Sequence, residues 1–397
     1  AMILIDEATL VLPDREVHGA ALVIEGGVIT GLLPAGAPRP AFATRLAYPG
    51  HRLLPGFIDV HVHGVEGVDV LDTAEAVAII AARLPRFGVT GFCPTTVACA
   101  PDALAKVLGG VAAARAEPSP SSARVLPAHL ESNFLNPAYH GAQPASCLRL
   151  PDDTPVASGA STYSGRDVLR VIAGHRAEVG IVTLAPEIEG GLELVRELSA
   201  AGHRVSLGHS GATYEQAMTA IEAGARHATH LFNRMPPLGH RAPGLAGAVL
   251  ASSRVTAEII CDGHHVHPAM VRLALDAKRS GGLMAITDGT AGAGLPVGAR
   301  AQLGGRTIVV TERAAELEDG TFAGSVLTMD GALRMLVQQV GLSVVEAARM
   351  CATTPADALG FTGHGRITRG SIADLVVLDA RLRVRQTFVA GHPCLEH

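Results

Sequence analysis

The central part of the chain alternates between short apolar runs and longer stretches in which apolar residues recur with helical spacing. The short runs predict buried strands, and amphipathic stretches such as Thr73–Arg86 and Tyr214–Ala223 predict the helices between them. The apolar runs cover residues 53–61, 89–94, 125–131, 179–185, 204–209, 228–232, 255–261 and 283–288. Strand–helix units in this number predict an α/β fold of the TIM-like (β/α)8 barrel type.

The two ends of the chain have a different pattern. Residues 2–52 and 366–394 alternate apolar and polar positions over short segments, which are separated by turn pairs such as Pro13-Asp14. Their common character predicts that both ends fold together as one small β-sandwich domain. The expected segments are 1–53 and 361–397 for this β domain, and 54–360 for the barrel.

The first apolar run, LLPGFIDVHVHG, carries the strongest local signal. Alternate residues of a strand point to the same side, so His61 and His63 direct two imidazoles toward one point. Gly64 then allows the chain to leave the strand sharply. The alternative is a buried strand with two incidental histidines.

Residues of metal-binding type follow several of the apolar runs. They are His61 and His63 after the first run, Glu131 after the third, His209 after the fifth, His230 after the sixth and Asp288 after the eighth. Because the carboxyl ends of barrel strands meet at one face, we expect these side chains to lie together. This regularity favours a metal site over incidental histidines.

Four imidazoles and two carboxylates suit zinc as the default ion, with Fe²⁺, Mn²⁺ and Co²⁺ as alternatives. Six ligands exceed the need of one tetrahedral catalytic ion, so we expect one or two ions, and Glu131 is the natural bridge. A bound ion lowers the pKa of its water, and Asp288 is placed to accept that proton and pass it to a leaving group. This is a hydrolase design without a Ser or Cys nucleophile.

Two segments do not fit the regular alternation. Residues 151–165 are small and polar, and form either a mobile lid or an inert surface insertion. Residues 290–325 are rich in glycine and predict an irregular hairpin, before a helix at Leu327–Val340.

The composition excludes several classes of protein. The chain has 397 residues, 48% hydrophobic and 17% charged, with a net charge of −5 and no tryptophan. Without a basic run, nucleic acid is not an expected partner, and no apolar run is long enough to span a membrane. The first residues carry acids where a signal peptide has basic residues, and the six scattered cysteines suit free thiols. We therefore expect a cytoplasmic enzyme.

The arrangement of ligand types along the barrel resembles the amidohydrolase superfamily. The segments PGFIDVHVHG, HLESNFLNP, LGHSGATY, ATHLFNRMPP, CDGHHVHP and ITDGT are together similar to those of the N-acetylglucosamine-6-phosphate deacetylase family. The resemblance runs from about residue 53 to the C-terminus. It implies metal-dependent hydrolysis of the N-acetyl group of an amino sugar phosphate, giving acetate and the free amine, by a homodimeric enzyme.

The resemblance also implies roles for individual residues. Glu131, His209 and His230 match metal ligands of the family, and Asp288 matches its catalytic acid/base. Some family members lack the first-strand histidine pair and hold one ion, so the pair in this chain allows a second. The positions that match sugar-phosphate contacts are Asn233, Arg241 and His265, and one phosphate contact can come from the neighbouring subunit.

The chain departs from the family pattern near the expected substrate. Ser132 and Asn133 replace a common Gly-Pro pair, Gln143 replaces a histidine, and Arg234 replaces a small residue. Gln can donate a hydrogen bond but carries no charge. We therefore add Ser132, Gln143 and Arg234 to the expected substrate contacts.

Two alternatives follow from these departures. The first is an amidohydrolase for a different N-acyl amino sugar, with or without phosphate, or for an N-acyl amino acid, and dependence on the 6-phosphate would separate it. The second is a non-catalytic scaffold, which would be expected to lose ligands, and metal analysis would separate it.

Overall fold

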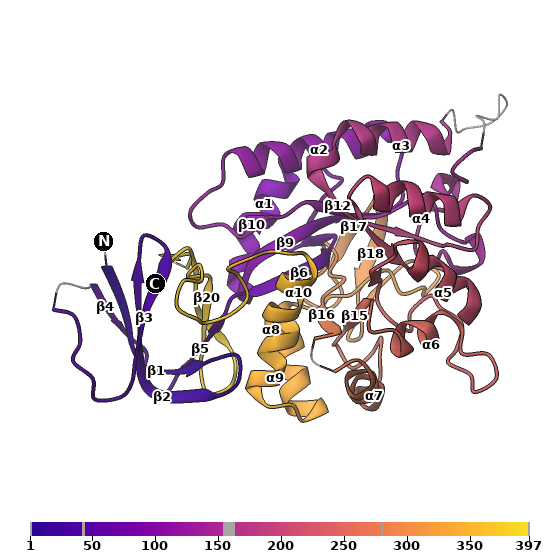
Figure 1. The fold of residues 1–397 in the computed structure, drawn as a ribbon. Helices are drawn as coiled ribbons and strands as arrows, with labels where there is room; N and C mark the ends of the chain where they lie inside the picture. The colour runs from indigo at the N-terminus through magenta and orange to yellow at the C-terminus, as the bar shows by residue number, and fades with distance from the viewer. Residues whose placement is uncertain (1, 42–43, 154–162, 280, 396–397) are drawn as a thin grey trace.

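The computed structural model describes residues 2–41, 44–153, 163–279 and 281–395. Parallel strands form a barrel and follow one another around it in chain order (Figure 1). These strands are β6 (Phe57–Val62), β9 (Val89–Thr96), β11 (Ala128–Glu131), β12 (Val179–Leu184), β13 (Arg204–Leu207), β14 (His227–Ala228), β15 (Thr256–Ile260) and β16 (Leu283–Ile286). A short strand, β10 (Arg124–Val125), also pairs with β9.

The barrel closes between its first and last strands. The Asp288 amide donates to the His61 carbonyl at 2.9 Å, and the His63 amide donates to the Gly289 carbonyl at 2.7 Å. Closure therefore uses the same residues that were predicted as ligands, and it brings both ends of the barrel sequence together. The predicted (β/α)8 barrel is confirmed.

A helix follows each barrel strand. These helices are α1 (Ala76–Arg83), α2 (Pro101–Ala116), α3 (Gly165–Gly174), α4 (Gly191–Ala200), α5 (Tyr214–Ala223), α6 (Gly244–Ala251), α7 (Pro268–Lys278) and α8 (Met329–Met335). In α5, Thr213 and Gln216 cap each other's backbone amides, and Ala217, Ala220 and Ile221 form the buried face.

Three connecting segments differ from their predictions. The predicted helix at 73–86 is shortened to α1, followed by a 3₁₀ turn, because Pro85 has no amide to continue the α-helical hydrogen bonds. The glycine-rich segment after β16 is an antiparallel sheet of β17 (Arg300–Leu303), β18 (Arg306–Val310) and β19 (Ala315–Glu316) rather than an irregular hairpin. Residues 154–162, the centre of the predicted lid, lie outside the described residues.

Shorter elements complete the barrel. A small hairpin of β7 (Gly64–Val65) and β8 (Val68–Asp69) leaves the first strand, and a Cβ atom at Gly64 would lie 2.2 Å from the Val68 carbonyl oxygen. Glycine is therefore required at the exit of the strand that carries the two histidines. After α8, a π turn at Leu336–Val340 leads to α9 (Val344–Ala348) and α10 (Thr354–Ala358).

The two ends of the chain form one β domain, at the left of Figure 1, where both termini lie. Leu53 pairs with Val377 in the antiparallel ladder that joins the N-terminal and C-terminal strands. The strands of this β domain are β1 (Met2–Val11), β2 (Glu16–Glu25), β3 (Val28–Leu33), β4 (Thr44–Ala47), β5 (Arg52–Pro55), β20 (Leu375–Leu378), β21 (Val384–Val389) and β22 (His392–Pro393). They belong to one hydrogen-bonded sheet with its own apolar core. The domain boundaries stay a prediction.

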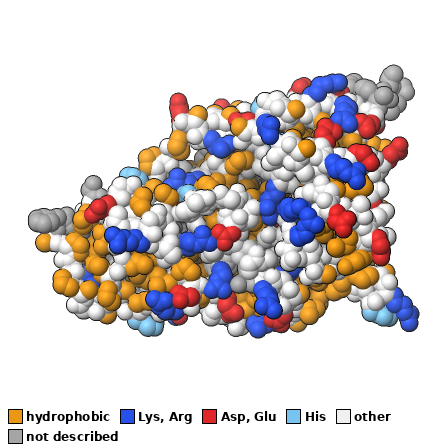
Figure 2. Space-filling model, in the orientation of Figure 1, with side chains coloured by type: hydrophobic (Ala, Val, Ile, Leu, Met, Phe, Trp, Pro, Cys, Tyr) orange, Lys and Arg blue, Asp and Glu red, His pale blue; other side chains and the backbone are white. Residues whose placement is uncertain are grey.

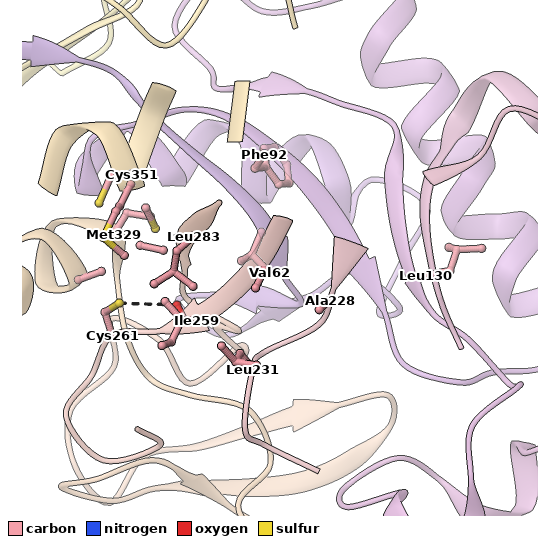
Figure 3. Packing of buried hydrophobic residues seen from close by; sticks show 14 of the residues in the cluster. Val62, Phe92, Leu130, Ala228, Leu231, Ile259, Cys261, Leu283, Met329 and Cys351 are labelled. Atoms are coloured by element: carbon pink, nitrogen blue, oxygen red, sulfur yellow. Dashed lines mark hydrogen bonds between the residues drawn. The ribbon is translucent and has the colours of Figure 1, made fainter. Parts of the chain in front are cut away.

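The barrel has a separate and larger apolar core. Side chains from different strands, among them Val62, Phe92 and Leu283, belong to it (Figure 3).

On the surface, basic and acidic side chains are intermixed over the face in Figure 2. Within the described residues, no helix combines the length and apolar character needed to cross a membrane.

Candidate metal and active site

The six predicted ligands lie together at the carboxyl ends of the barrel strands. All six side chains are buried, and five of them line a cavity of about 630 Å³. They form two groups that share Glu131. One group is His61, His63, Glu131 and Asp288, and the other is Glu131, His209 and His230.

Glu131 uses one carboxylate oxygen for each group. Its Oε1 lies 3.0 Å from His209 Nε2 and 3.1 Å from His230 Nε2. Its Oε2 lies 3.2 Å from His63 Nε2 and 3.6 Å from His61 Nε2. This is the geometry expected of a carboxylate that bridges two ions.

Asp288 completes the group that contains His61 and His63. Its Oδ1 lies 3.2 Å from the Nε2 atoms of both His61 and His63. Despite these short separations, this buried oxygen has no well-directed hydrogen bond to any described residue. A buried, unsatisfied carboxylate oxygen is costly unless a cation completes it.

The four imidazoles are oriented by their outer nitrogens. Each Nδ1 faces an oxygen, so Nε2 is the nitrogen that each ring directs into the site. The partners are Glu258 Oε2 for His61 (2.9 Å), the Thr95 carbonyl for His63 (3.1 Å), the Tyr139 carbonyl for His209 (2.8 Å) and the Asn233 carbonyl for His230 (3.1 Å). Metal-ligating histidines almost always have such a partner.

The spacing of the donor atoms fits an ion of zinc size. The Nε2 atoms are 3.3 Å apart in the His61–His63 pair and 3.1 Å apart in the His209–His230 pair. Ligands about 2.1 Å from a tetrahedral ion are roughly 3.4 Å from each other. The site is therefore able to hold a divalent metal ion without large rearrangement.

Three of the six residues have left-handed backbone conformations. The φ angles are 46° at His209, 27° at His230 and 48° at Asp288. Such conformations cost about 1–3 kcal/mol each in residues other than glycine, and they persist where the surrounding structure enforces them, often at functional sites. Here they turn the side chains inward at the points where strands end.

Electrostatics makes the site attractive to cations. Burial would raise the pKa of Glu131, but the charge of His61 and the hydrogen bond from His209 lower it well below its usual range. Burial would likewise raise the pKa of Asp288, but His61 and His63 lower it. Burial disfavours a charged His63, yet the nearby carboxylates of Asp288 and Glu131 raise its pKa to about 9. Both carboxylates are thus ionised, and the imidazoles are drawn to bind a proton or a metal ion.

Four of the predicted substrate contacts line the cavity, namely Gln143, Asn233, Arg234 and His265. His265 is oriented by Asp262, whose Oδ2 lies 2.6 Å from its Nδ1. Gln143 accepts from the Ala98 amide at 2.8 Å, so its NH₂ group faces Glu131 Oε2 at 2.7 Å. Gln143 therefore holds the Glu131 carboxylate, a contact that sequence reasoning did not foresee.

The other two predicted contacts lie elsewhere. The Ser132 hydroxyl donates to the Thr183 carbonyl at 2.6 Å and is not part of the cavity wall. Arg241 is exposed and also lies outside the wall. Their roles toward substrate stay predictions.

Two other features could be mistaken for the site. A larger cavity of about 1030 Å³ lies at the opposite, amino ends of the strands, but none of the clusters of possible metal ligands found among the described residues lies in it. Below the site, His61, His129 and Glu258 lie close together. His129 is already occupied, because its Nδ1 faces the Val60 carbonyl (2.9 Å) and its Nε2 faces the Thr183 hydroxyl (2.7 Å).

Comparisons with known proteins indicate the family of this chain. A model of the amidohydrolase family matches residues 52–394. An N-acetylglucosamine-6-phosphate deacetylase from Lysinibacillus sphaericus is 36% identical over 86% of this chain and 85% of that protein. An N-acetylgalactosamine-6-phosphate deacetylase from Escherichia coli O157:H7 is 35% identical over 92% of this chain and 93% of that protein.

A solved structure is similar over the whole chain. It is a variant of the N-acetyl-D-glucosamine-6-phosphate deacetylase from Mycobacterium smegmatis in complex with N-acetyl-D-glucosamine 6-phosphate. Its TM-score is 0.89 at 32% identity, and the match covers 100% of each chain. The chain therefore belongs to the amidohydrolase family and is a hydrolase of the deacetylase group within it.

Proposed function

We propose that this enzyme removes the acetyl group from an N-acetylated amino sugar 6-phosphate, with N-acetyl-D-glucosamine 6-phosphate as the first candidate. The observation that carries the proposal is the pair of ligand groups that share Glu131 at the floor of a cavity. The cavity volume of about 630 Å³ lies within the usual range for small-molecule sites.

The proposed metal centre uses Glu131, His209 and His230 for one ion, and His61, His63, Glu131 and Asp288 for a second. When bound, a divalent ion supplies a Lewis acid that activates water and polarises the acetyl carbonyl. Zinc is the proposed ion, because the donor set of imidazoles and carboxylates suits it, and Fe²⁺, Mn²⁺ and Co²⁺ are the alternatives.

The side chains divide the remaining work. Asp288 accepts a proton from the attacking water and delivers it to the departing nitrogen, so that water and the amide become acetate and a free amine. Gln143 keeps the Glu131 carboxylate in place. Asn233, Arg234 and His265 lie on the cavity wall, and we propose that they donate hydrogen bonds to the phosphate.

We also propose a homodimer. Arg241 is exposed and stands off the wall of its own cavity. A second subunit would let it reach the phosphate in the neighbouring cavity, as the family resemblance implies.

The six free cysteines, four of them buried, support the proposal of a reducing, cytoplasmic location.

N-acetyl-D-galactosamine 6-phosphate is the second candidate substrate. The relative that bears this activity in its name is 35% identical, against 36% for the Lysinibacillus deacetylase. Because the two identities are nearly equal, both epimers at C4 of the sugar belong in the test.

The test is acetate release from both 6-phosphates and from unphosphorylated N-acetyl-D-glucosamine. We expect kcat/KM for one of the 6-phosphates to exceed that for the unphosphorylated sugar by at least about tenfold, because a charge-assisted hydrogen bond contributes about 1.5–3 kcal/mol. Equal rates with and without the phosphate would contradict the proposed phosphate site. No acetate from any of the three would contradict the proposed function.

A further inference from the structure

A buried carboxylate, Glu258, lies directly beneath the proposed second ion. It belongs to β15 and is fully buried. Its Oε2 lies 2.9 Å from His61 Nδ1 and accepts from the His230 amide at 3.2 Å. Its Oε1 lies 2.9 Å from His227 Nε2. Glu258 does not line the site cavity, and sequence analysis did not single it out.

The directions of these hydrogen bonds follow from Arg204, which ends the series of contacts that runs from His61 through Glu258 and His227. Arg204 Nε lies 2.9 Å from His227 Nδ1, and a guanidinium can only donate. His227 Nδ1 is therefore the acceptor, so His227 carries its proton on Nε2 and donates it to Glu258. Glu258 in turn has its other oxygen available for His61.

This arrangement determines the state of His61. With Nδ1–H donated to Glu258, Nε2 is the nitrogen of His61 that faces Asp288 and Glu131 and that would bind an ion in place of a proton. The other three imidazoles of the site have backbone carbonyls as partners. Among these four imidazoles, only that of His61 has a side chain as the partner of its Nδ1, and the partner is anionic, which makes the imidazole a stronger donor.

We infer that Glu258, held by His227 and Arg204, is the positioning residue that builds the second ion site and decides whether the chain holds one ion or two. The inference rests on the metal centre proposed above. The ring nitrogens of His209 and His230, which would hold the first ion, do not contact Glu258. A change at Glu258 should therefore affect the two ions differently.

The direct test is Glu258→Gln. An amide has one oxygen in place of two, so one of the two histidines is left facing an NH₂ group. If that is His61, its proton must move to Nε2, where the ion would bind. Partners of ligating histidines are typically worth 10- to 100-fold in metal affinity. We therefore expect the Kd of the second ion to rise about 10- to 100-fold, and that of the first ion to stay within about threefold.

The measurement is zinc content after equilibration against graded, buffered Zn²⁺, together with the visible spectrum of the Co²⁺-loaded protein. Glu258→Asp is a second variant, in case the amide prevents folding. It keeps the charge but withdraws the carboxylate from His61, so it should also lose the second ion. Asp59→Asn is the matched control, because Asp59 is an equally buried carboxylate that contacts His61 only through its backbone amide, at 3.3 Å.

The outcomes separate the two proposals. Two ions in the parent and in Asp59→Asn, with the second weakened in the Glu258 variants, support the inference. Parental affinities in folded Glu258 variants, a parallel loss of both ions, or loss of the second ion in Asp59→Asn overturn it. A parent that binds a single ion also overturns it, whereas a parent that binds no ion overturns the metal centre itself.

Discussion

Replacing Asp288 with Asn separates proton transfer from metal binding. Asn has nearly the same shape and keeps an oxygen beside His61 and His63, so the packing around the 3.2 Å contacts should survive. It cannot accept the proton that a buried, ionised Asp288 accepts. General acid–base catalysis is typically worth 10²- to 10⁴-fold, which corresponds to about 2.7–5.4 kcal/mol of activation free energy.

The assay is steady-state acetate release from N-acetyl-D-glucosamine 6-phosphate. We expect kcat of Asp288→Asn to fall by about 10²- to 10⁴-fold with a smaller change in KM, because the proton moves in the transition state. Metal content and melting temperature should stay near those of the parent. Asp69→Asn is a suitable control, because Asp69 is buried, accepts a hydrogen bond from the Leu71 amide and lies outside the cavity wall. A folded, metal-loaded Asp288→Asn enzyme with a parental rate would refute the role of Asp288.

Three further predictions test other parts of the site. His209→Ala should lose the ion held with Glu131 and His230, and full metal content in that variant would contradict the assignment. Arg241→Ala should raise KM for a 6-phosphorylated substrate by roughly 10- to 150-fold, from about 1.5–3 kcal/mol, and leave an unphosphorylated analogue unchanged; equal losses on both would make Arg241 structural. In the metal-free protein His63 keeps its proton up to about pH 9, and an ion must displace that proton, so metal affinity should rise with pH below about 9. Calorimetry in buffers of different ionisation enthalpy should then detect proton release, and its absence would contradict the raised pKa of His63.

The barrel and the gathering of the six candidate ligands could be predicted because each leaves a local mark in the sequence. The strand period places His61 and His63 on one side, and each later ligand directly follows an apolar run. A barrel then brings together the ends of strands that are far apart in the chain. The position of Glu131 between the two histidine pairs could be predicted for the same reason, since a carboxylate has two oxygens.

Other features leave no such mark. Glu258 stands in the apolar run Val255–Cys261, and its partner His61 is 197 positions away, so only the fold brings them together. The contact between Gln143 and Glu131 depends on the path of an irregular loop. The left-handed backbone at Asp288 occurs where the chain closes the barrel against His61, and Asp adopts this conformation only occasionally, so the local sequence does not predict it. The position of Arg241 likewise depends on a loop that no periodicity describes.

The most direct test of the central claim is the metal dependence of deacetylation. The purified enzyme would be stripped with a chelator, checked for residual metal, and assayed for acetate release from both N-acetylhexosamine 6-phosphates before and after stepwise addition of Zn²⁺. The structure predicts that the stripped enzyme is folded but inactive, and that activity returns in step with bound zinc and levels off at no more than two ions per chain. Undiminished activity in the metal-free enzyme would contradict the proposed use of Glu131, His209 and His230.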